Sequence, residues 1–289
     1  MQLLANLLPA LLLLAVAGCA QQTAPAPANH TPAATTQNPI GFDSNDYPGD
    51  DALPALRRHF VFAGYWLTNP PGEHQNSWRG KRDALLHNDF GFLVLANGKF
   101  DAEIKKAKRS GTSPAALGKK DAAAAVGAAQ REHFPDHTII FLDQEEGGRL
   151  NADQSGYLLA WTEAVAHSGY LPGVYASGQP VEDSPGKTIT TVQDIREQVA
   201  FKHLQPIACW VYQDACPPSN GCTLHPPPLA SNGTPDVAAW QYAQSPRRKE
   251  ITAACSKTYA ADGNCYAPGL PKIMLDLSVA GSPDPSHGR

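Results

Sequence analysis

Residues 138–148 read Thr-Ile-Ile-Phe-Leu-Asp-Gln-Glu-Glu-Gly-Gly, and this stretch is the most informative feature of the chain. Its first five residues are β-branched or apolar, and such a continuous run favours a strand that is buried on both faces. Asp143 and Glu145 follow where that strand should end. Side chains two residues apart in a strand point to the same side, with Cα atoms roughly 6–7 Å apart. The two acids would then suit acid–base chemistry on a neutral bond such as a glycosidic linkage. The alternative is a polar turn in which one acid caps the next helix.

Strand-like and helix-like segments alternate along residues 40–280. Short apolar or β-branched runs predict eight strands, over 40–43, 61–66, 91–96, 138–142, 171–176, 206–212, 237–242 and 273–277. Helical spacing or alanine-rich composition predicts helices over 50–59, 78–87, 113–133, 155–167 and 191–201. Repeated strand–helix units predict an α/β fold, a single TIM-like (β/α)8 barrel of parallel strands. Loop-like segments follow the sixth and seventh strands, so we expect the last repeats to be irregular.

Four acids fall near the ends of expected strands. They are Asp43, Asp143, Glu145 and Asp276. In a parallel barrel the C-terminal ends of all strands meet at one mouth, where catalytic residues gather. The first and last strands are neighbours in a closed barrel, so Asp43 and Asp276 would flank the opening that the fourth strand faces. We therefore predict one acidic cluster built from distant parts of the chain.

We do not expect the N-terminal segment to be part of this domain. Residues 1–18 are apolar and lead through Val16-Ala17-Gly18 into Cys19. Small residues before a cysteine at this depth resemble a bacterial lipoprotein signal, which is cut before a cysteine that is then acylated. The segment has no basic n-region, and an ordinary signal peptide or a short uncleaved helix is the alternative. We expect lipid attachment at Cys19 and export to the cell envelope, in the outer membrane if the cell is Gram-negative, because Ala20 follows.

The composition of the remaining chain sets its organisation. Residues 19–39 mix Ala, Pro, Thr, Gln and Asn without an apolar period, which predicts a disordered tether after the lipidated cysteine. We expect the barrel over 40–280 and a disordered tail over 281–289. The chain has 23 basic and 27 acidic residues and a net charge of -4. Without a basic face, the sequence argues against nucleic acid as a partner.

Five cysteines lie in the expected domain, and an exported chain can oxidise them. Cys216 and Cys222 bracket one polar loop, and Cys255 and Cys265 bracket another. We predict these two local disulfides, with Cys209 left as a buried thiol in a strand. The sequence has no Cys-x-x-Cys pair and no His-Glu-x-x-His motif among its ten histidines. We therefore predict no metal site and no cofactor.

Five short motifs occur in order: Gly41-Phe42-Asp43, Phe141-Leu142-Asp143-Gln144-Glu145, Gly173-Val174-Tyr175-Ala176-Ser177, Trp240-Gln241-Tyr242 and Leu275-Asp276-Leu277. Together they resemble DUF1906, the Rv2525c-like glycoside hydrolase-like domain, over roughly residues 40–280. That domain is similar in turn to the family 25 lysozymes, which are TIM-like barrels that cleave the glycan of peptidoglycan. The resemblance implies a hydrolase whose partner is peptidoglycan or another envelope glycan.

The resemblance also implies a role for each acid. The lysozyme pattern carries an Asp on the first strand, an Asp-x-Glu on the fourth and an Asp on the last. Glu145 would be the general acid, and Asp143 would stabilise positive charge at the sugar or orient a substrate N-acetyl group. Asp43 and Asp276 would hold the hydrogen bonds of the site and tune its pKa values. Glu146 follows directly, so the acid is either Glu145 or Glu146.

Aromatic and amide side chains near the strand ends complete the expected cleft, since sugars stack on aromatic rings. They are Tyr65, Tyr175, Trp240, Gln241 and Tyr242. Two other functions stay open. One is a lipid-anchored, non-catalytic glycan-binding protein that kept the cleft. The other is a metal-dependent phosphodiesterase-type barrel in which the acids hold Mg²⁺ or Ca²⁺, although the sequence shows no glycine-rich phosphate-binding loop.

Overall fold

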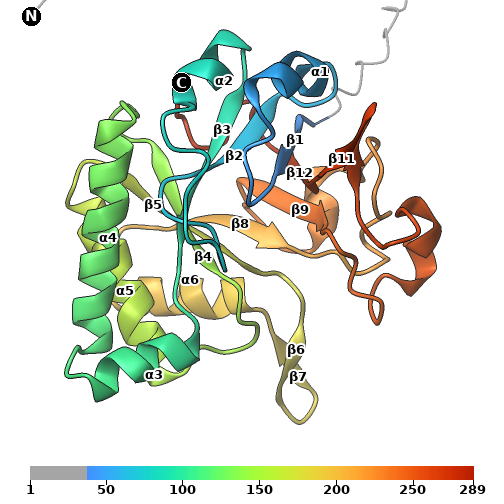
Figure 1. Ribbon diagram of the computed structural model, residues 1–289. Coiled ribbons are helices and arrows are strands. Elements are labelled where there is room, and N and C mark those ends of the chain that lie inside the picture. Colours follow the sequence, from blue (N-terminus) through green and yellow to red (C-terminus); the bar gives the residue numbers. More distant parts are fainter. Residues whose placement is uncertain (1–37) are drawn as a thin grey trace, which may run out of the picture. The chain divides into compact units, whose positions relative to one another are not determined.

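A computed structural model describes residues 38–289. The expected signal over 1–18, the lipidation site Cys19 and nearly all of the tether lie outside the described residues. The central strands are β1 (Ile40–Asp43), β2 (Phe62–Trp66), β3 (Gly91–Asn97), β4 (Ile139–Gln144), β5 (Leu171–Ser177), β8 (Ala208–Tyr212), β9 (Ala239–Ala243) and β12 (Asp276–Ala280). They form a closed barrel in the order β1-β12-β9-β8-β5-β4-β3-β2 (Figure 1). The prediction of an α/β barrel is confirmed.

The α-helices all precede β8 in the described chain. They are α1 (Leu53–Arg57), α2 (Arg82–His87), α3 (Asp101–Arg109), α4 (Pro114–Arg131), α5 (Ala152–Ala166) and α6 (Thr191–Phe201). Polar N-caps start the longer ones: the Asn151 side chain accepts from two backbone N–H groups at the start of α5, and Thr190 caps α6. Figure 1 shows α3, α4 and α5 along one side of the barrel. No helix of residues 38–289 has both the length and the apolar character that crossing a membrane would require.

Loops, short hairpins and 3-10 turns occupy the places where the last crossover helices would be. After β8 these are the 3-10 segments η2 (Leu229–Asn232) and η3 (Ala253–Thr258) and the hairpin of β10 (Tyr266–Ala267) with β11 (Leu270–Met274). Earlier in the chain, the 3-10 segment η1 (Asp50–Ala52) precedes α1, and the hairpin of β6 (Val181–Ser184) with β7 (Lys187–Ile189) precedes α6. Figure 1 shows the β10–β11 region on the side of the barrel opposite α4. Residues 213–275 therefore form, apart from β9, an irregular excursion beside the barrel mouth.

The last barrel strand runs in the opposite direction to the one predicted. The sequence suggested a parallel strand over 273–277, whereas β12 starts at Asp276 and is antiparallel to both β1 and β9. A parallel neighbour needs a crossover connection, usually a helix, and the excursion before β12 contains none. The reversal puts the start of β12 at the mouth, where Asp276 pairs in register with Asp43.

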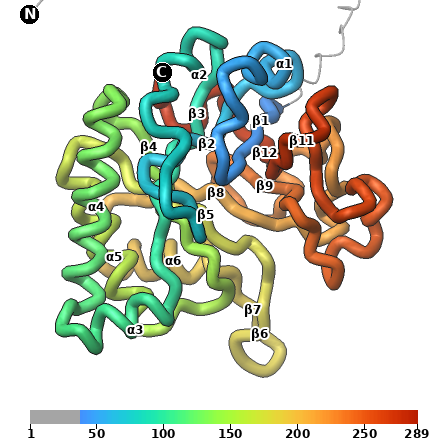
Figure 2. Tube along the Cα trace, viewed as in Figure 1, coloured from blue at the N-terminus to red at the C-terminus, as the bar shows by residue number. Residues whose placement is uncertain are grey.

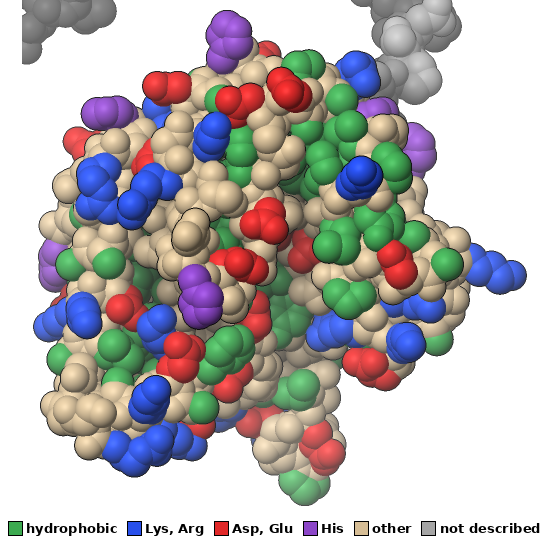
Figure 3. Space-filling model, in the orientation of Figure 1, with side chains coloured by type: hydrophobic (Ala, Val, Ile, Leu, Met, Phe, Trp, Pro, Cys, Tyr) green, Lys and Arg blue, Asp and Glu red, His purple; other side chains and the backbone are tan. Residues whose placement is uncertain are grey.

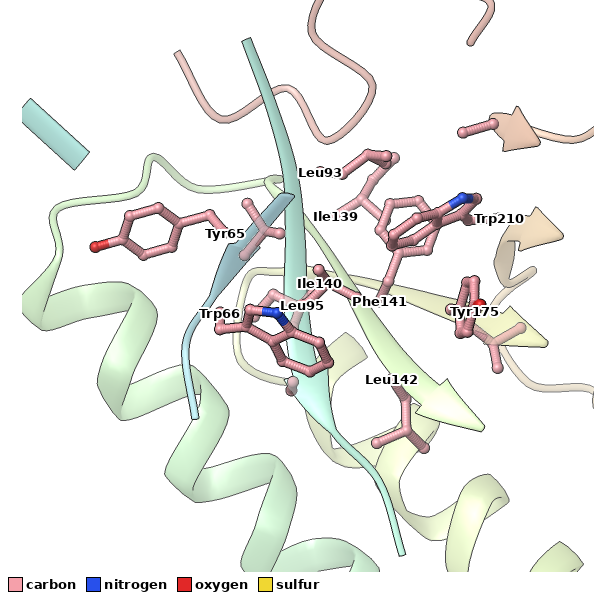
Figure 4. Packing of buried hydrophobic residues seen from close by; sticks show 14 of the residues in the cluster. Tyr65, Trp66, Leu93, Leu95, Ile139, Ile140, Phe141, Leu142, Tyr175 and Trp210 are labelled. Carbon is pink, nitrogen blue, oxygen red and sulfur yellow. The ribbon is translucent and has the colours of Figure 1, made fainter. Parts of the chain in front are cut away.

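The two-residue period of the strands divides their side chains between the barrel interior and the helix-facing side. Figure 4 shows Tyr65 pointing the opposite way from its neighbour Trp66, while Phe141, Trp210 and Tyr175 gather together. The ring centroids of Tyr175 and Trp210 are 4.6 Å apart, and those of Phe141 and Trp210 are 6.1 Å apart. Tilted and edge-on aromatic contacts of this kind fill the barrel beneath the mouth.

Residues 281–289 differ from the expected disordered tail, because they pack across the N-terminal end of β3 and β4. The Ser286 backbone donates to the Phe92 carbonyl oxygen and accepts from the Ile139 N–H, both at 2.8 Å. The Ser286 hydroxyl accepts from the Val94 N–H, also at 2.8 Å. Figure 2 shows the C-terminus beside α2. The tail is ordered because it satisfies buried backbone groups that the barrel leaves unpaired.

The disulfide prediction was wrong in its pairing. The structure joins Cys216 to Cys255 across 39 residues, and Cys209, Cys222 and Cys265 are free thiols. Both predicted bridges were local, but pairing depends on which loops of the excursion fold against each other. Cys222 and Cys265 lie within hydrogen-bonding reach of each other. Cys209 is buried in β8, as expected.

Replacing Ser286 by alanine should lower the free energy of unfolding by about 1–3 kcal/mol, because the buried Val94 N–H loses its acceptor. Urea unfolding followed by circular dichroism measures the change. Ser110→Ala, at an exposed position after α3, should cost less than about 0.5 kcal/mol. Equal effects of the two substitutions would contradict a structural role for the tail.

Candidate functional site

The four predicted acids come together at the barrel mouth. A cavity of about 330 Å³ opens there, and Asp43, Asp143, Glu145 and Asp276 all line it. They arrive from the ends of β1 and β4 and from the start of β12. Figure 3 shows acidic side chains gathered around a hollow near the middle of the visible face.

Gln241 on β9 holds Asp43 and Asp276 together. Its amide nitrogen Nε2 donates to Asp43 Oδ1 at 3.1 Å, to Asp43 Oδ2 at 3.2 Å and to Asp276 Oδ2 at 3.5 Å. The Ser245 backbone N–H donates to Asp276 Oδ1 at 2.6 Å. One side-chain amide and one backbone group thus partner two adjacent carboxyls, of which Asp43 is buried and Asp276 is half-buried.

Two further side chains fix the orientation of that amide. The Tyr175 hydroxyl donates to Gln241 Oε1 at 2.6 Å, and Gln244 Nε2 donates to the same oxygen at 2.8 Å. Gln244 Nε2 also donates to the Tyr175 hydroxyl oxygen at 2.9 Å. Because the amide oxygen is occupied by donors, the amide nitrogen must face the acids. Tyr175 and Gln241, both expected in the cleft, line the cavity.

Asp143 and Glu145 differ in their surroundings although they are two residues apart. Asp143 is 6% exposed, and its Oδ1 has no hydrogen-bond partner within residues 38–289. Glu145 follows β4 and is exposed to the cavity. Its backbone oxygen accepts from the Tyr212 hydroxyl at 2.7 Å, while no group of the described chain donates to its carboxyl.

The Glu146 carboxyl is hydrogen-bonded to two neighbouring segments. Its Oε2 accepts from the Asp101 backbone N–H at 2.7 Å and from Gln154 Nε2 at 2.6 Å. These contacts tie the end of β4 to the starts of α3 and α5. Of the two glutamates that the sequence left as candidates, Glu145 is the one that faces the cavity.

Burial raises the pKa of every acid in the cluster, and repulsion by a neighbouring acid adds to the rise for Asp43, Asp143 and Asp276. Burial, with a smaller contribution from Asp143, raises the pKa of Asp43 to about 7, against the opposing hydrogen bond from Gln241. Burial first and Asp43 second raise the pKa of Asp276 well above its usual range. Burial and the neighbouring Glu145 do the same for Asp143, and partial burial raises the pKa of Glu145. Clustered acids with raised pKa values are typical of catalytic sites.

Tyr65 is not in the cleft, contrary to the prediction. It points outward from β2, and its hydroxyl donates to Glu132 Oε2 at 2.7 Å. Its neighbour Trp66 lines the cavity instead and donates from Nε1 to the Ser44 carbonyl oxygen at 3.2 Å. Alternation along the strand allows only one of the two aromatics to face inward.

The same alternation excludes Trp240 and Tyr242 from the cleft, since Gln241 between them faces inward. Trp240 Nε1 donates to the Gln213 carbonyl oxygen at 2.8 Å, and the Tyr242 hydroxyl donates to the Thr223 carbonyl oxygen at 2.7 Å. Both rings are completely buried on the outer side of β9. They position the excursion and do not contact the cavity.

The sequence analysis missed several residues that line the cavity. Tyr212 and Trp210 come from β8, where their two-residue spacing was a usable signal. Arg248 comes from the irregular excursion, where no strand or helix period predicts which way a side chain points. It is paired with the buried Asp214 through Nε at 3.0 Å, and its guanidinium lies 5.3 Å from the centre of the Tyr212 ring.

Amide and backbone donors hold Asp43 and Asp276, whereas Asp143 Oδ1 and the carboxyl of Glu145 have no donor among residues 38–289. Within residues 38–289, no group of three or more His, Cys, Asp or Glu side chains has an arrangement that could hold a metal ion. The chemistry that this geometry offers is proton transfer and charge stabilisation by carboxyl groups.

Residues 91–254 match the family described as the Rv2525c-like, glycoside hydrolase-like domain, and the match spans more than half of the chain. The chain belongs to this family. The Rv2525c-like match includes β4 with Asp143 and Glu145, and it includes Gln241 on β9. No curated protein matches the chain.

Solved structures resemble this chain at low sequence identity. An uncharacterized protein of B. stearothermophilus is 20% identical, with a TM-score of 0.52 over 83% of this chain and 95% of its own. The Tat-secreted protein Rv2525c of Mycobacterium tuberculosis, in complex with HEPES, is 13% identical, with a TM-score of 0.48 over 85% of this chain and 96% of its own. The catalytic domain of endolysin ply40 from bacteriophage P40 of Listeria monocytogenes is 12% identical, with a TM-score of 0.42 over 86% and 96%.

The raised pKa of Asp43 should make the fold less stable as the pH rises. The folded state binds this proton more tightly than the unfolded state, so the stabilisation is complete below about pH 4 and is lost as the pH passes about 7. Urea unfolding between pH 4 and pH 8 should show this fall, and Asp43→Asn should flatten it. Asp51→Asn, at an exposed position, should keep the original slope. An unchanged slope in Asp43→Asn would contradict the assignment.

Proposed function

We propose that this Rv2525c-like domain is a glycoside hydrolase that cleaves the glycan of peptidoglycan by carboxylate acid–base chemistry. The observation that carries the proposal is the contrast between Glu145 and the acids around it. Glu145 is exposed to the cavity and free of hydrogen bonds from the described residues, while Asp43 and Asp276 are fixed by Gln241. A free acid beside anchored acids is the arrangement that proton donation to a bound substrate needs.

Glu145 would act as the general acid. Partial burial raises the pKa of Glu145, so a larger fraction of its carboxyl groups is protonated near neutral pH than for a glutamate fully surrounded by water. Protonation of the glycosidic oxygen lets the bond break toward an oxocarbenium-like transition state. Cleavage should therefore slow as the pH rises through the raised pKa of Glu145.

Asp143 would act on the sugar itself. Its buried Oδ1 lacks a donor among the described residues, and an unmet acceptor of this kind is costly unless a ligand supplies one. The amide N–H of a substrate N-acetyl group is a donor of the right kind. That hydrogen bond, together with positive charge developing on the ring, would lower the pKa of Asp143 and favour its ionised form. The proton would then remain on Glu145.

We also propose that the protein is exported and lipid-anchored at Cys19. The support is the small-residue segment before Cys19, together with the Cys216–Cys255 disulfide, since disulfides persist mainly outside the cytoplasm. An anchor would hold the barrel close to its glycan on a tether about twenty residues long.

Glu145→Gln should reduce release of reducing ends from purified peptidoglycan by about 10²- to 10⁴-fold, because the amide cannot donate the proton. Binding to the same peptidoglycan, measured by cosedimentation, should persist. Glu146→Gln is the matched control and should stay within a few-fold of the wild type, since its amide oxygen still accepts from Asp101. Loss of activity in Glu146→Gln alone would identify the neighbouring residue as the acid. A wild-type protein that binds peptidoglycan without releasing fragments would instead favour the glycan-binding alternative.

Cys19→Ser should release the protein from the membrane fraction, because the acylated thiol is lost. Fractionation of the producing cells and intact mass of the purified protein measure the effect. A Cys19→Ser protein that stays in the membrane fraction, or a wild type with no lipid mass, would overturn the anchor.

A further inference from the structure

The acidic site continues beyond the main cavity. A second, much smaller recess of about 10 Å³ shares Pro71, Asp143 and Glu145 with the first and is otherwise lined by the end of β3 and the loop that follows it, including Lys99 and Phe100. The two recesses therefore meet at the proposed acid. A polymer whose cleaved bond lies over Glu145 must place one sugar on each side of that residue.

Phe100 is exposed in a way that core packing does not explain. Its side chain is 41% exposed, and only a few large hydrophobic side chains of residues 38–289 are exposed at all. Burying such a ring is favourable, so an aromatic ring left open beside polar catalytic groups is a feature of sugar-binding clefts. The exposed ring borders the second recess, so a sugar over Glu145 could lie against its open face.

The backbone that carries Phe100 is held rigidly. Phe100 is the N-cap of α3, and its N–H donates to Glu103 Oε2 at 3.0 Å. The next N–H, that of Asp101, donates to Glu146 Oε2 at 2.7 Å. The residue after Phe100 is therefore hydrogen-bonded to Glu146, the residue beside Glu145. Pre-positioned aromatic groups bind with less loss of conformational entropy than mobile ones.

We propose that Phe100 forms a sugar-binding subsite, on which the hexosamine ring at one side of the cleaved bond stacks. Lys99 lies in the same recess and would donate to hydroxyl or carboxylate groups of that sugar. The subsite rests on the proposed glycan-cleaving function and extends it to a substrate of at least two rings. The deeper cavity, with Tyr175 and Tyr212, would hold the other ring.

The test measures glycan binding without turnover. In a Glu145→Gln background, calorimetry with a peptidoglycan tetrasaccharide should show binding that Phe100→Ala weakens roughly 3- to 20-fold. Phe100→Tyr should restore the affinity, because it restores the ring. Phe201→Ala is the matched control, since Phe201 is 78% exposed at the end of α6 and lines neither recess. It should leave binding unchanged.

N-acetylglucosamine alone separates a stacking role from a structural one. This single sugar can occupy the deeper cavity, so its affinity and the melting temperature should be the same with and without Phe100→Ala. A tetrasaccharide affinity that Phe100→Ala leaves unchanged would overturn the subsite while leaving the proposed function intact. Equal weakening for both ligands would also overturn it. Absence of any glycan binding by the parent variant would overturn the proposed function and the subsite together.

Discussion

The antiparallel pairing of β1 with β12 closes the barrel, and it sets Asp43 directly opposite Asp276. Two carboxyls side by side in a buried position repel each other and lose hydration, which is why both pKa values rise. The Gln241 amide reduces that cost by donating to both. The strand pairing that closes the barrel therefore also brings these two acids of the site together. A closed sheet also leaves no edge strand to pair with other chains.

Further hydrogen bonds connect the Asp43–Asp276 pair to the other side of the barrel mouth. Tyr175 on β5 and Gln244, just after β9, orient the Gln241 amide, so these three side chains form one hydrogen-bond network next to Asp143. Buried polar networks of this kind hold side chains in one arrangement when every member is satisfied. The exceptions are Asp143 Oδ1, which lacks a partner among residues 38–289, and the carboxyl of Glu145. Of the four acids that line the cavity, Asp143 and Glu145 thus keep free carboxyl oxygens, while Asp43 and Asp276 have donors.

Long-range packing decided the parts of the molecule that carry no regular period. The excursion between β8 and β12 supplies Ser245, Arg248 and one wall of the cavity, yet its direction depends on how its loops fold together. The Cys216–Cys255 disulfide also depends on long-range packing. Two cysteines that are distant in sequence can pair only after the loops that carry them have come together. The C-terminal tail is similar: a short polar segment without a period becomes ordered because the barrel presents unpaired backbone groups to it.

Local sequence pattern was enough to predict the α/β barrel, because apolar runs bounded by turns mark most of its strands. It was also enough to place the four acids near strand ends. Strand period also shows that Tyr65 and Trp66 cannot both face inward, and that Trp240 and Gln241 cannot either, because neighbouring side chains in a strand point to opposite faces. What a one-dimensional pattern does not contain is which face is the interior, and that choice depends on strand tilt and neighbours. Tertiary structure alone decided the reversed direction of β12, the pairing of Cys216 and the use of Glu146 as an anchor. Each of these depends on contacts between segments far apart in the chain, where local propensity carries no information.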